Sequence, residues 1–209
     1  MSISGEKVFH ILKEISIKMD ENKAFLSELD AAIGDGDHGL NMSKGFTAVV
    51  EKIKDEDKKD IGNILKKTGM TLVSNVGGAS GPLYGTAFMK AGAAVAGKSE
   101  IGLSDFIEIL EVALEGIKMR GKGESGDKTM IDAIAPAIEA LKESIHNGDS
   151  SLESLKKAKE AAYKGVEYTK GIVARKGRAS YLGERSIGHQ DAGATSSYIM
   201  LETIYETLK

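Results

Sequence analysis

The sequence contains no cysteine and only 2 prolines, whereas 25 of its 209 residues are glycine. Without cysteine the chain can form neither disulfides nor thiolate ligands, which fits a reducing cytoplasm. No run of 18 apolar residues occurs, and charged residues interrupt the first fifteen positions, so we expect neither a signal peptide nor a membrane contact. The net charge of −3 excludes an obvious nucleic-acid surface.

Helical periodicity runs through nearly the whole chain, and sustained strand alternation is missing. The first apolar stripe recurs at three- and four-residue steps from Val8 to Met19. Similar stripes cover residues 40–53, 60–75, 82–96, 104–119, 129–145, 152–174 and 191–208. Short connections favour antiparallel neighbours. The sequence therefore predicts an all-α fold of eight antiparallel amphipathic helices, with residues 1–209 as a single domain.

The glycines gather in four stretches, at 34–39, 77–85, 121–126 and 177–193. This distribution predicts one site built from separate loops. Three further glycines, Gly85, Gly92 and Gly97, fall in an alanine-rich helical stripe. We expect them to allow close helix packing, because a glycine inside a helix costs about 1 kcal/mol and needs such a reason.

The acidic segment, residues 29–42 (LDAAIGDGDHGLNM), carries the most specific chemical signal. Its three carboxylates, Asp30, Asp35 and Asp37, are interleaved with glycines. A calcium loop starting at Asp35 would need glutamate at its twelfth position, where Phe46 stands instead. Magnesium fits better, because it binds through one or two carboxylates and completes its shell with phosphate oxygens. The alternative is a solvated acidic turn.

Electrostatics also favours a metal in the acidic segment. A carboxylate and a phosphate oxygen about 4 Å apart repel each other by roughly 4 kcal/mol at an effective dielectric constant of 20. Three aspartates would therefore reject a polyphosphate unless divalent ions lay between the two. With such ions present, the aspartates clamp the phosphate oxygens instead.

Three other glycine-rich segments accompany the acidic one. In NVGGASGPLYG (75–85), glycines flank Ser80 and precede a predicted helix start, where free N–H groups suit phosphate. RGKGESGDKTM (120–130) forms a turn before another helix. The basic stretch 174–197 contains Arg175, Lys176, Arg178 and Arg185, which is typical of a glycine-hinged cover that closes on an anion. Ordinary turns and a solvated basic loop are the alternatives.

Together these segments closely resemble the nucleotide-binding L subunit of dihydroxyacetone kinases, over essentially the whole chain. The motifs on which this resemblance rests are residues 29–42, GGASGPLYGT (77–86), GDKTM (126–130) and RKGRASYLGERSIGHQDAGATS (175–196). The resemblance implies a closed barrel of eight antiparallel helices with a nucleotide, ADP or ATP, held at one end through two Mg²⁺ ions.

The resemblance also assigns residues, motif by motif. Asp30, Asp35 and Asp37 are expected to bind the metals and, with Arg178, to serve catalysis. The expected nucleotide contacts are His38, Gly39, Leu40, Asn41, Ala79, Ser80, Gly121, Met130, Arg178, Asp191, Ala192 and Gly193. Two positions where the family often has proline are Ser125 and Ala192 here, and we expect a somewhat looser cover in consequence.

The family has two forms, one fused to a substrate domain and using ATP, the other a separate chain that retains ADP. This chain resembles the second. The implied partners are a K subunit that binds dihydroxyacetone and an M subunit of the phosphotransferase system that donates the phosphoryl group. Two alternatives stay open: an ATP-dependent L-type domain for another acceptor such as a fatty acid, and a module whose nucleotide state signals to a transcription regulator.

Overall fold

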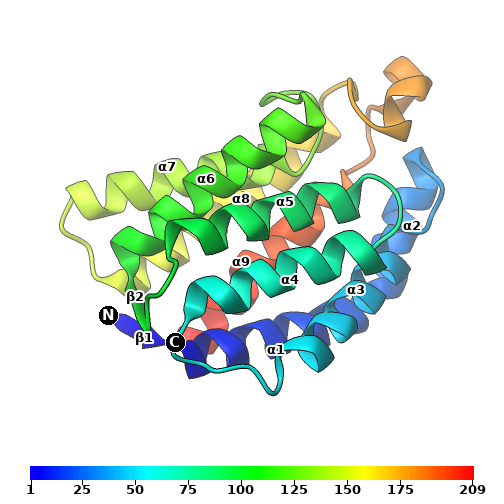
Figure 1. Cartoon of the computed structure of the whole chain (residues 1–209). Coiled ribbons are helices and arrows are strands. Elements are labelled where there is room, and N and C mark those ends of the chain that lie inside the picture. Colours follow the sequence, from blue (N-terminus) through cyan, green and yellow to red (C-terminus); the bar gives the residue numbers. More distant parts are fainter.

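The computed structural model describes residues 1–209, and nine α-helices dominate it (Figure 1). Their bounds are α1 Gly5–Glu21, α2 Lys23–Ile33, α3 His38–Ile53, α4 Ile61–Asn75, α5 Ser80–Ala94, α6 Leu103–Gly121, α7 Ile131–His146, α8 Ser151–Lys170 and α9 Ala192–Leu208. A 3-10 helix, η1 (Arg178–Ser186), and two short strands, β1 (Ser2–Ser4) and β2 (Glu100–Gly102), complete the secondary structure.

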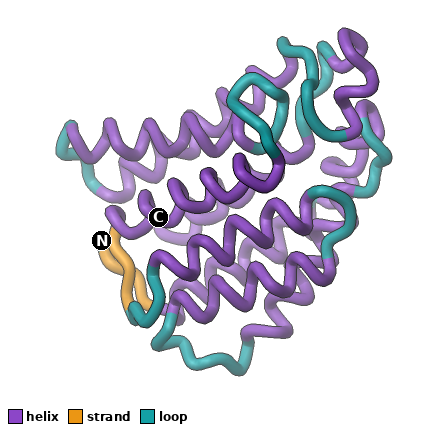
Figure 2. The backbone as a smooth tube through the Cα atoms, turned by 45° about the horizontal axis from the view of Figure 1, so that its top comes forward, coloured by secondary structure: helices purple, strands orange, loops and turns teal.

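Eight of the helices form a closed ring. Each packs against the next in the order α1, α3, α4, α5, α6, α7, α8, α9, and α9 packs against α1 (Figures 1 and 2). The predicted all-α fold is therefore confirmed. The helix α2 was not predicted: it lies outside the ring, at one end, and contacts α3, α9 and η1. The structure thus has one helix more than the eight expected, and the eight ring helices are those that the periodicity identified.

The hydrophobic core fills the inside of the ring. The stripe of α1 that the sequence predicted, from Val8 through Leu12 to Met19, is buried there, and Phe46 of α3 is fully enclosed. Burying a side chain of this size stabilises the fold by roughly 1.5–3 kcal/mol. The apolar faces therefore hold the barrel together, and its ends are left to the loops.

Glycines bring α4 and α5 close together. A Cβ atom added to Gly92 would lie 2.6 Å from the carbonyl oxygen of Gly62, and one added to Gly85 would lie 2.8 Å from that of Gly69. The packing role predicted for Gly85 and Gly92 is confirmed. The same prediction is wrong for Gly97, which follows the end of α5, has a φ of +74° and faces open space.

The two strands close the end of the barrel at which both chain termini lie. β1 and β2 pair antiparallel, with Ile3 opposite Ile101, beside both chain termini (Figure 1). η1 and the C-terminal end of α2 lie at the opposite end of the barrel. No helix in the structure combines the length and the apolar character that crossing a bilayer requires.

Candidate functional site

Four helices begin at the end of the barrel that carries η1. A cavity of about 460 Å³ lies there, lined by the first residues of α3, α5, α7 and α9: His38, Ser80, Ile131 and Ala192. The antiparallel ring causes this arrangement, because every second helix starts at the same end. Each helix N-terminus carries partial positive charge and unpaired N–H groups, so four of them around one cavity favour an anion.

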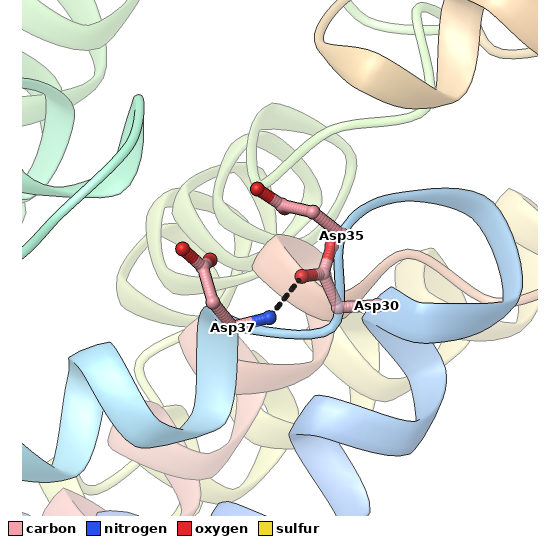
Figure 3. Close-up of side chains that lie close together, drawn as sticks. All are labelled: Asp30, Asp35 and Asp37. Atoms are coloured by element: carbon pink, nitrogen blue, oxygen red, sulfur yellow. Dashed lines mark hydrogen bonds between the residues drawn. The ribbon is translucent and has the colours of Figure 1, made fainter.

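The acidic segment forms one wall of this cavity. Asp30 lies in the last turn of α2, and Asp35 and Asp37 follow in the connection to α3 (Figure 3). One carboxylate oxygen from each of the three lies within 4.8 Å of the others. Asp30 Oδ2 accepts hydrogen bonds from the backbone N–H of Asp37 (3.0 Å) and of His38 (3.2 Å). These bonds fold the connection back over the end of α2.

Glycine is required in this turn. A Cβ atom on Gly34 would lie 2.3 Å from Oδ1 of Asp30, and Gly36 has a φ of +77°. The turn therefore places three carboxylates close together without any side chain between them. Carboxylates at this spacing repel one another, and hard oxygen ligands on a tight turn suit Mg²⁺. The residues present fit a magnesium site.

A buried polar network joins three of the helix N-termini. His38 Nδ1 lies 3.0 Å from Ser80 Oγ, and His38 Nε2 lies 2.9 Å from Ser196 Oγ. The hydroxyl of Tyr84 lies 2.8 Å from Ser196 Oγ and donates to the carbonyl of Gly193 at 3.1 Å. Burial lowers the pKa of His38, although Asp30 and Asp37 oppose this. A neutral imidazole with both nitrogens engaged therefore orients α3, α5 and α9 relative to one another.

The lid, which we define as residues 174–191, covers the acidic wall. It contains η1, and Arg178 at the start of η1 forms an ion pair with Asp35, with 2.9 Å between Nη2 and Oδ2. Lys176 and Arg178 line the cavity, whereas Arg175 and Arg185 are exposed outside it. Only part of the basic charge that the sequence indicated therefore faces the site.

Asp191 ends the lid and caps α9. Its Oδ2 accepts a hydrogen bond from the backbone N–H of Ala194 at 2.7 Å. Burial raises the pKa of this carboxyl to about 7, and the nearby charges of Asp132 and Asp30 act in the same direction, against the bond from Ala194 and the charge of Lys128. A carboxyl group that titrates near neutral pH therefore lies in the cavity wall.

Most of the expected site residues surround this one cavity. Those that line it are Asp30, Asp35, Asp37, His38, Ala79, Ser80, Gly121, Met130, Arg178, Asp191, Ala192 and Gly193. Gly39, Leu40 and Asn41 do not: Leu40 is 61% exposed, and Gly39 packs against the backbone of α2. Sequence reasoning missed Arg120 and Lys128, which also line the cavity. The individual roles of these residues remain predictions.

Fold and site together define an all-α barrel protein that places a cluster of carboxylates opposite helix N-termini, as a metal-dependent phosphate-binding protein does. The chain belongs to the DAK2 domain family, whose model matches residues 32–206.

Curated relatives match the chain over nearly its full length. The "PEP-dependent dihydroxyacetone kinase, ADP-binding subunit DhaL" of Escherichia coli K12 is 45% identical over 204 residues, which cover 98% of this chain and 97% of that protein. The "PTS-dependent dihydroxyacetone kinase, ADP-binding subunit DhaL" of Lactococcus lactis is 42% identical and covers 94% of each. The resemblance to L subunits seen in the motifs is thereby confirmed.

A solved structure supports the fold. The dihydroxyacetone kinase from C. freundii, in complex with AMP-PNP and Mg²⁺, superposes with a TM-score of 0.74 at 24% identity. The match covers 99% of this chain and 34% of that one, so this chain corresponds to about a third of the longer protein.

Proposed function

We propose that residues 1–209 act as one nucleotide-binding domain, the L subunit of a dihydroxyacetone kinase that depends on phosphoenolpyruvate. In this proposal the chain holds ADP with two Mg²⁺ ions in the cytoplasm, and an M subunit of the phosphotransferase system converts that ADP to ATP. The phosphoryl group then passes to dihydroxyacetone on a separate K subunit. The observation that carries the proposal is the cavity with three carboxylates on one wall and four helix N-termini on the others.

The chain's own residues have distinct tasks in this reaction. Asp30, Asp35 and Asp37 would hold the magnesium, which would neutralise the charge of the phosphate oxygens. The backbone N–H groups at the start of α5, beside Ala79 and Ser80, bind phosphate oxygens, and the His38–Ser80 contact keeps the starts of α3 and α5 in register. Arg178 contributes positive charge from the lid side, where it stabilises the transferring group. The cavity volume of about 460 Å³ is in the usual range for sites that bind small molecules or cofactors, which includes a nucleotide.

Activation of the acceptor hydroxyl is assigned to the K subunit. Both ring nitrogens of His38 are engaged by serine hydroxyls, and burial keeps its pKa low, so it is not free to take a proton from a substrate. Phosphoryl transfer needs mainly positioning and electrostatic stabilisation from the donor side. These are what the carboxylates, helix starts and Arg178 of this chain provide.

The deciding experiment has two steps. The purified protein is passed through gel filtration and assayed for bound ADP, and it is then reconstituted with K and M subunits. We expect stoichiometric ADP that is lost on chelation of magnesium, and transfer from phosphoenolpyruvate to dihydroxyacetone without added nucleotide. A protein that emerges empty, and transfers only with excess free ATP and a K subunit, would contradict the retained-ADP form. A protein that binds no nucleotide at all would overturn the proposal.

A further inference from the structure

Lys128 is a lysine in an unusual setting. It is 1% exposed, and its backbone is left-handed, with a φ of +62°. Its ammonium group contacts four main-chain carbonyl oxygens: Thr169 at 2.5 Å, His189 at 2.5 Å, Ser186 at 2.8 Å and Ile172 at 3.3 Å. Lysine favours neither burial nor a positive φ, so both features call for a specific role.

The charge of Lys128 has no ion-pair partner. All four hydrogen-bond acceptors of Nζ are main-chain carbonyl oxygens, and none is a carboxylate. Burial lowers the pKa of Lys128, and the charge of Asp191 partly offsets this effect. The carbonyl dipoles replace water around the ammonium. A ring of main-chain carbonyl oxygens is also the ligand set that binds a bare potassium ion. Lys128 therefore fills a site with the chemistry of a monovalent-cation site.

The four carbonyls come from both ends of the lid. Thr169 and Ile172 precede the lid, and Ser186 and His189 lie near its far end. Other bonds close the same base: Gly188 N–H donates to Lys170 O at 2.7 Å, and Ala174 N–H donates to Ser186 Oγ at 2.9 Å. Lys128 thus lies where the two ends of the lid meet, and the free part between them carries Arg178.

We propose that Lys128 is a positioning residue whose ammonium group acts as a built-in monovalent cation, gathering both ends of the lid so that Arg178 is held over the acidic segment. Its effect on the nucleotide rests on the proposed function, whereas its effect on lid order does not.

The test removes the ammonium group and supplies a small cation instead. Lys128→Gly keeps the left-handed backbone without strain, and Lys128→Met keeps the aliphatic chain without charge. Trypsin cleavage within 175–185, followed by intact mass, reports lid order without nucleotide. We expect Lys128→Gly to be cut at least tenfold faster than wild type. Potassium or ammonium should restore resistance, because each can approach the carbonyl oxygens closely. Tetramethylammonium at equal ionic strength should not, because its methyl groups keep its charge away from these oxygens.

Lys122→Gly is the matched control. The backbone of Lys122 is also left-handed, with a φ of +51°, but this residue is exposed and is the C-cap of α6. Its replacement should leave lid cleavage at the wild-type rate in every salt. An unchanged cleavage rate in Lys128→Gly, or faster cleavage that no small cation reverses, would overturn the proposal. So would failure of both Lys128 variants to fold in every cation tested.

Nucleotide release provides the second readout. The release rate of a fluorescent ADP analogue from Lys128→Gly should rise at least tenfold and fall again with the cations that restore the lid. If the lid becomes cation-dependent but release does not change, the link from Lys128 through the lid to the nucleotide is wrong. If wild type binds no ADP, the proposed function fails, and the proteolysis result still decides the role of Lys128 in the lid.

Discussion

Arg178 Nη2 lies 2.9 Å from Asp35 Oδ2, which joins the lid to the acidic segment across the mouth of the cavity. The arginine side chain is 66% exposed and the aspartate 36%. An ion pair this exposed contributes only about 0–1 kcal/mol to stability. Both partners are therefore free to exchange: Asp35 toward a metal ion, and Arg178 toward a phosphate.

Arg178→Gln should separate function from stability. We expect the free energy of unfolding to change by less than about 1 kcal/mol, because only an exposed pair is lost. Phosphoryl transfer in the reconstituted system should fall about 10²-fold or more, since a stabilising donor is missing from the transition state. Chemical denaturation and steady-state kinetics measure the two effects. Arg185→Gln, in the same lid but outside the cavity, is the control, and equal losses in the two variants would contradict the role of Arg178.

The metal proposal predicts that Asp37→Asn uncouples nucleotide binding from magnesium. At about 100 times Kd, a ligand stabilises the folded state by about 2.7 kcal/mol. For a chain of this size that corresponds to roughly 5–10 °C in Tm. Wild type with ADP should show this increase on addition of magnesium, and Asp37→Asn should lose most of it.

The control for this measurement is Asp55→Asn, an exposed carboxylate in the connection between α3 and α4. Its magnesium response should equal that of wild type. A full magnesium response in Asp37→Asn would remove this carboxylate from the metal site.

Periodicity was sufficient to predict the ring helices, because each buries one apolar stripe on the inside of the barrel. The motif residues were equally visible, since glycine and aspartate alternate where a loop must approach a ligand. The helix α2 was missed because its last turn carries Asp30 within a motif that looks like a loop. The prediction for Gly97 was wrong because the alanine-rich stripe continues beyond the end of α5, and the left-handed Gly97 belongs to the turn that follows this helix.

Long-range polar contacts could not be predicted at all. Lys128 bonds to carbonyls at least 41 residues further along the chain, and Tyr84 meets Ser196 across 112 residues. Main-chain carbonyls leave no trace in side-chain patterns. A lysine in GDKTM therefore gives no sign of its burial until the lid base is folded around it.

The raised pKa of Asp191 predicts that the free energy of unfolding depends on pH. Burial is the main cause that raises the pKa of this carboxyl from its ordinary value of 3.8 to about 7 in the folded state. Between about pH 4 and 7 the folded protein therefore holds a proton that the unfolded chain has released. This group then lowers stability by up to about 1.4 kcal/mol for each pH unit of increase, and the effect levels off above the folded pKa.

Asp191→Asn should remove that contribution while keeping the cap, because asparagine also accepts a hydrogen bond at this position. The variant should gain stability relative to wild type as the pH rises from 5 to 7. Urea unfolding of both proteins across this range, without nucleotide or magnesium, measures the difference. A difference that stays constant would show that Asp191 does not retain its proton in the folded state.

Ala192 is a position where proline should tighten the end of the lid. It is the first residue of α9, where the backbone N–H has no partner within the helix. The preceding Asp191 has a φ of −76° and a ψ of 128°, which is the extended conformation that a residue before proline prefers. Ala192→Pro should therefore raise the free energy of unfolding by about 0.4–1 kcal/mol by restricting the unfolded chain.

The same substitution should slow nucleotide release, because Ala192 lines the cavity directly after the lid. Release rates of a fluorescent ADP analogue from wild type and Ala192→Pro measure this effect, with unfolding curves recorded in parallel. Added stability with an unchanged release rate would show that the lid opens without moving the start of α9. Slower release would mean that opening of the lid includes this helix start, so that the Asp191 cap and the position of Arg178 are coupled.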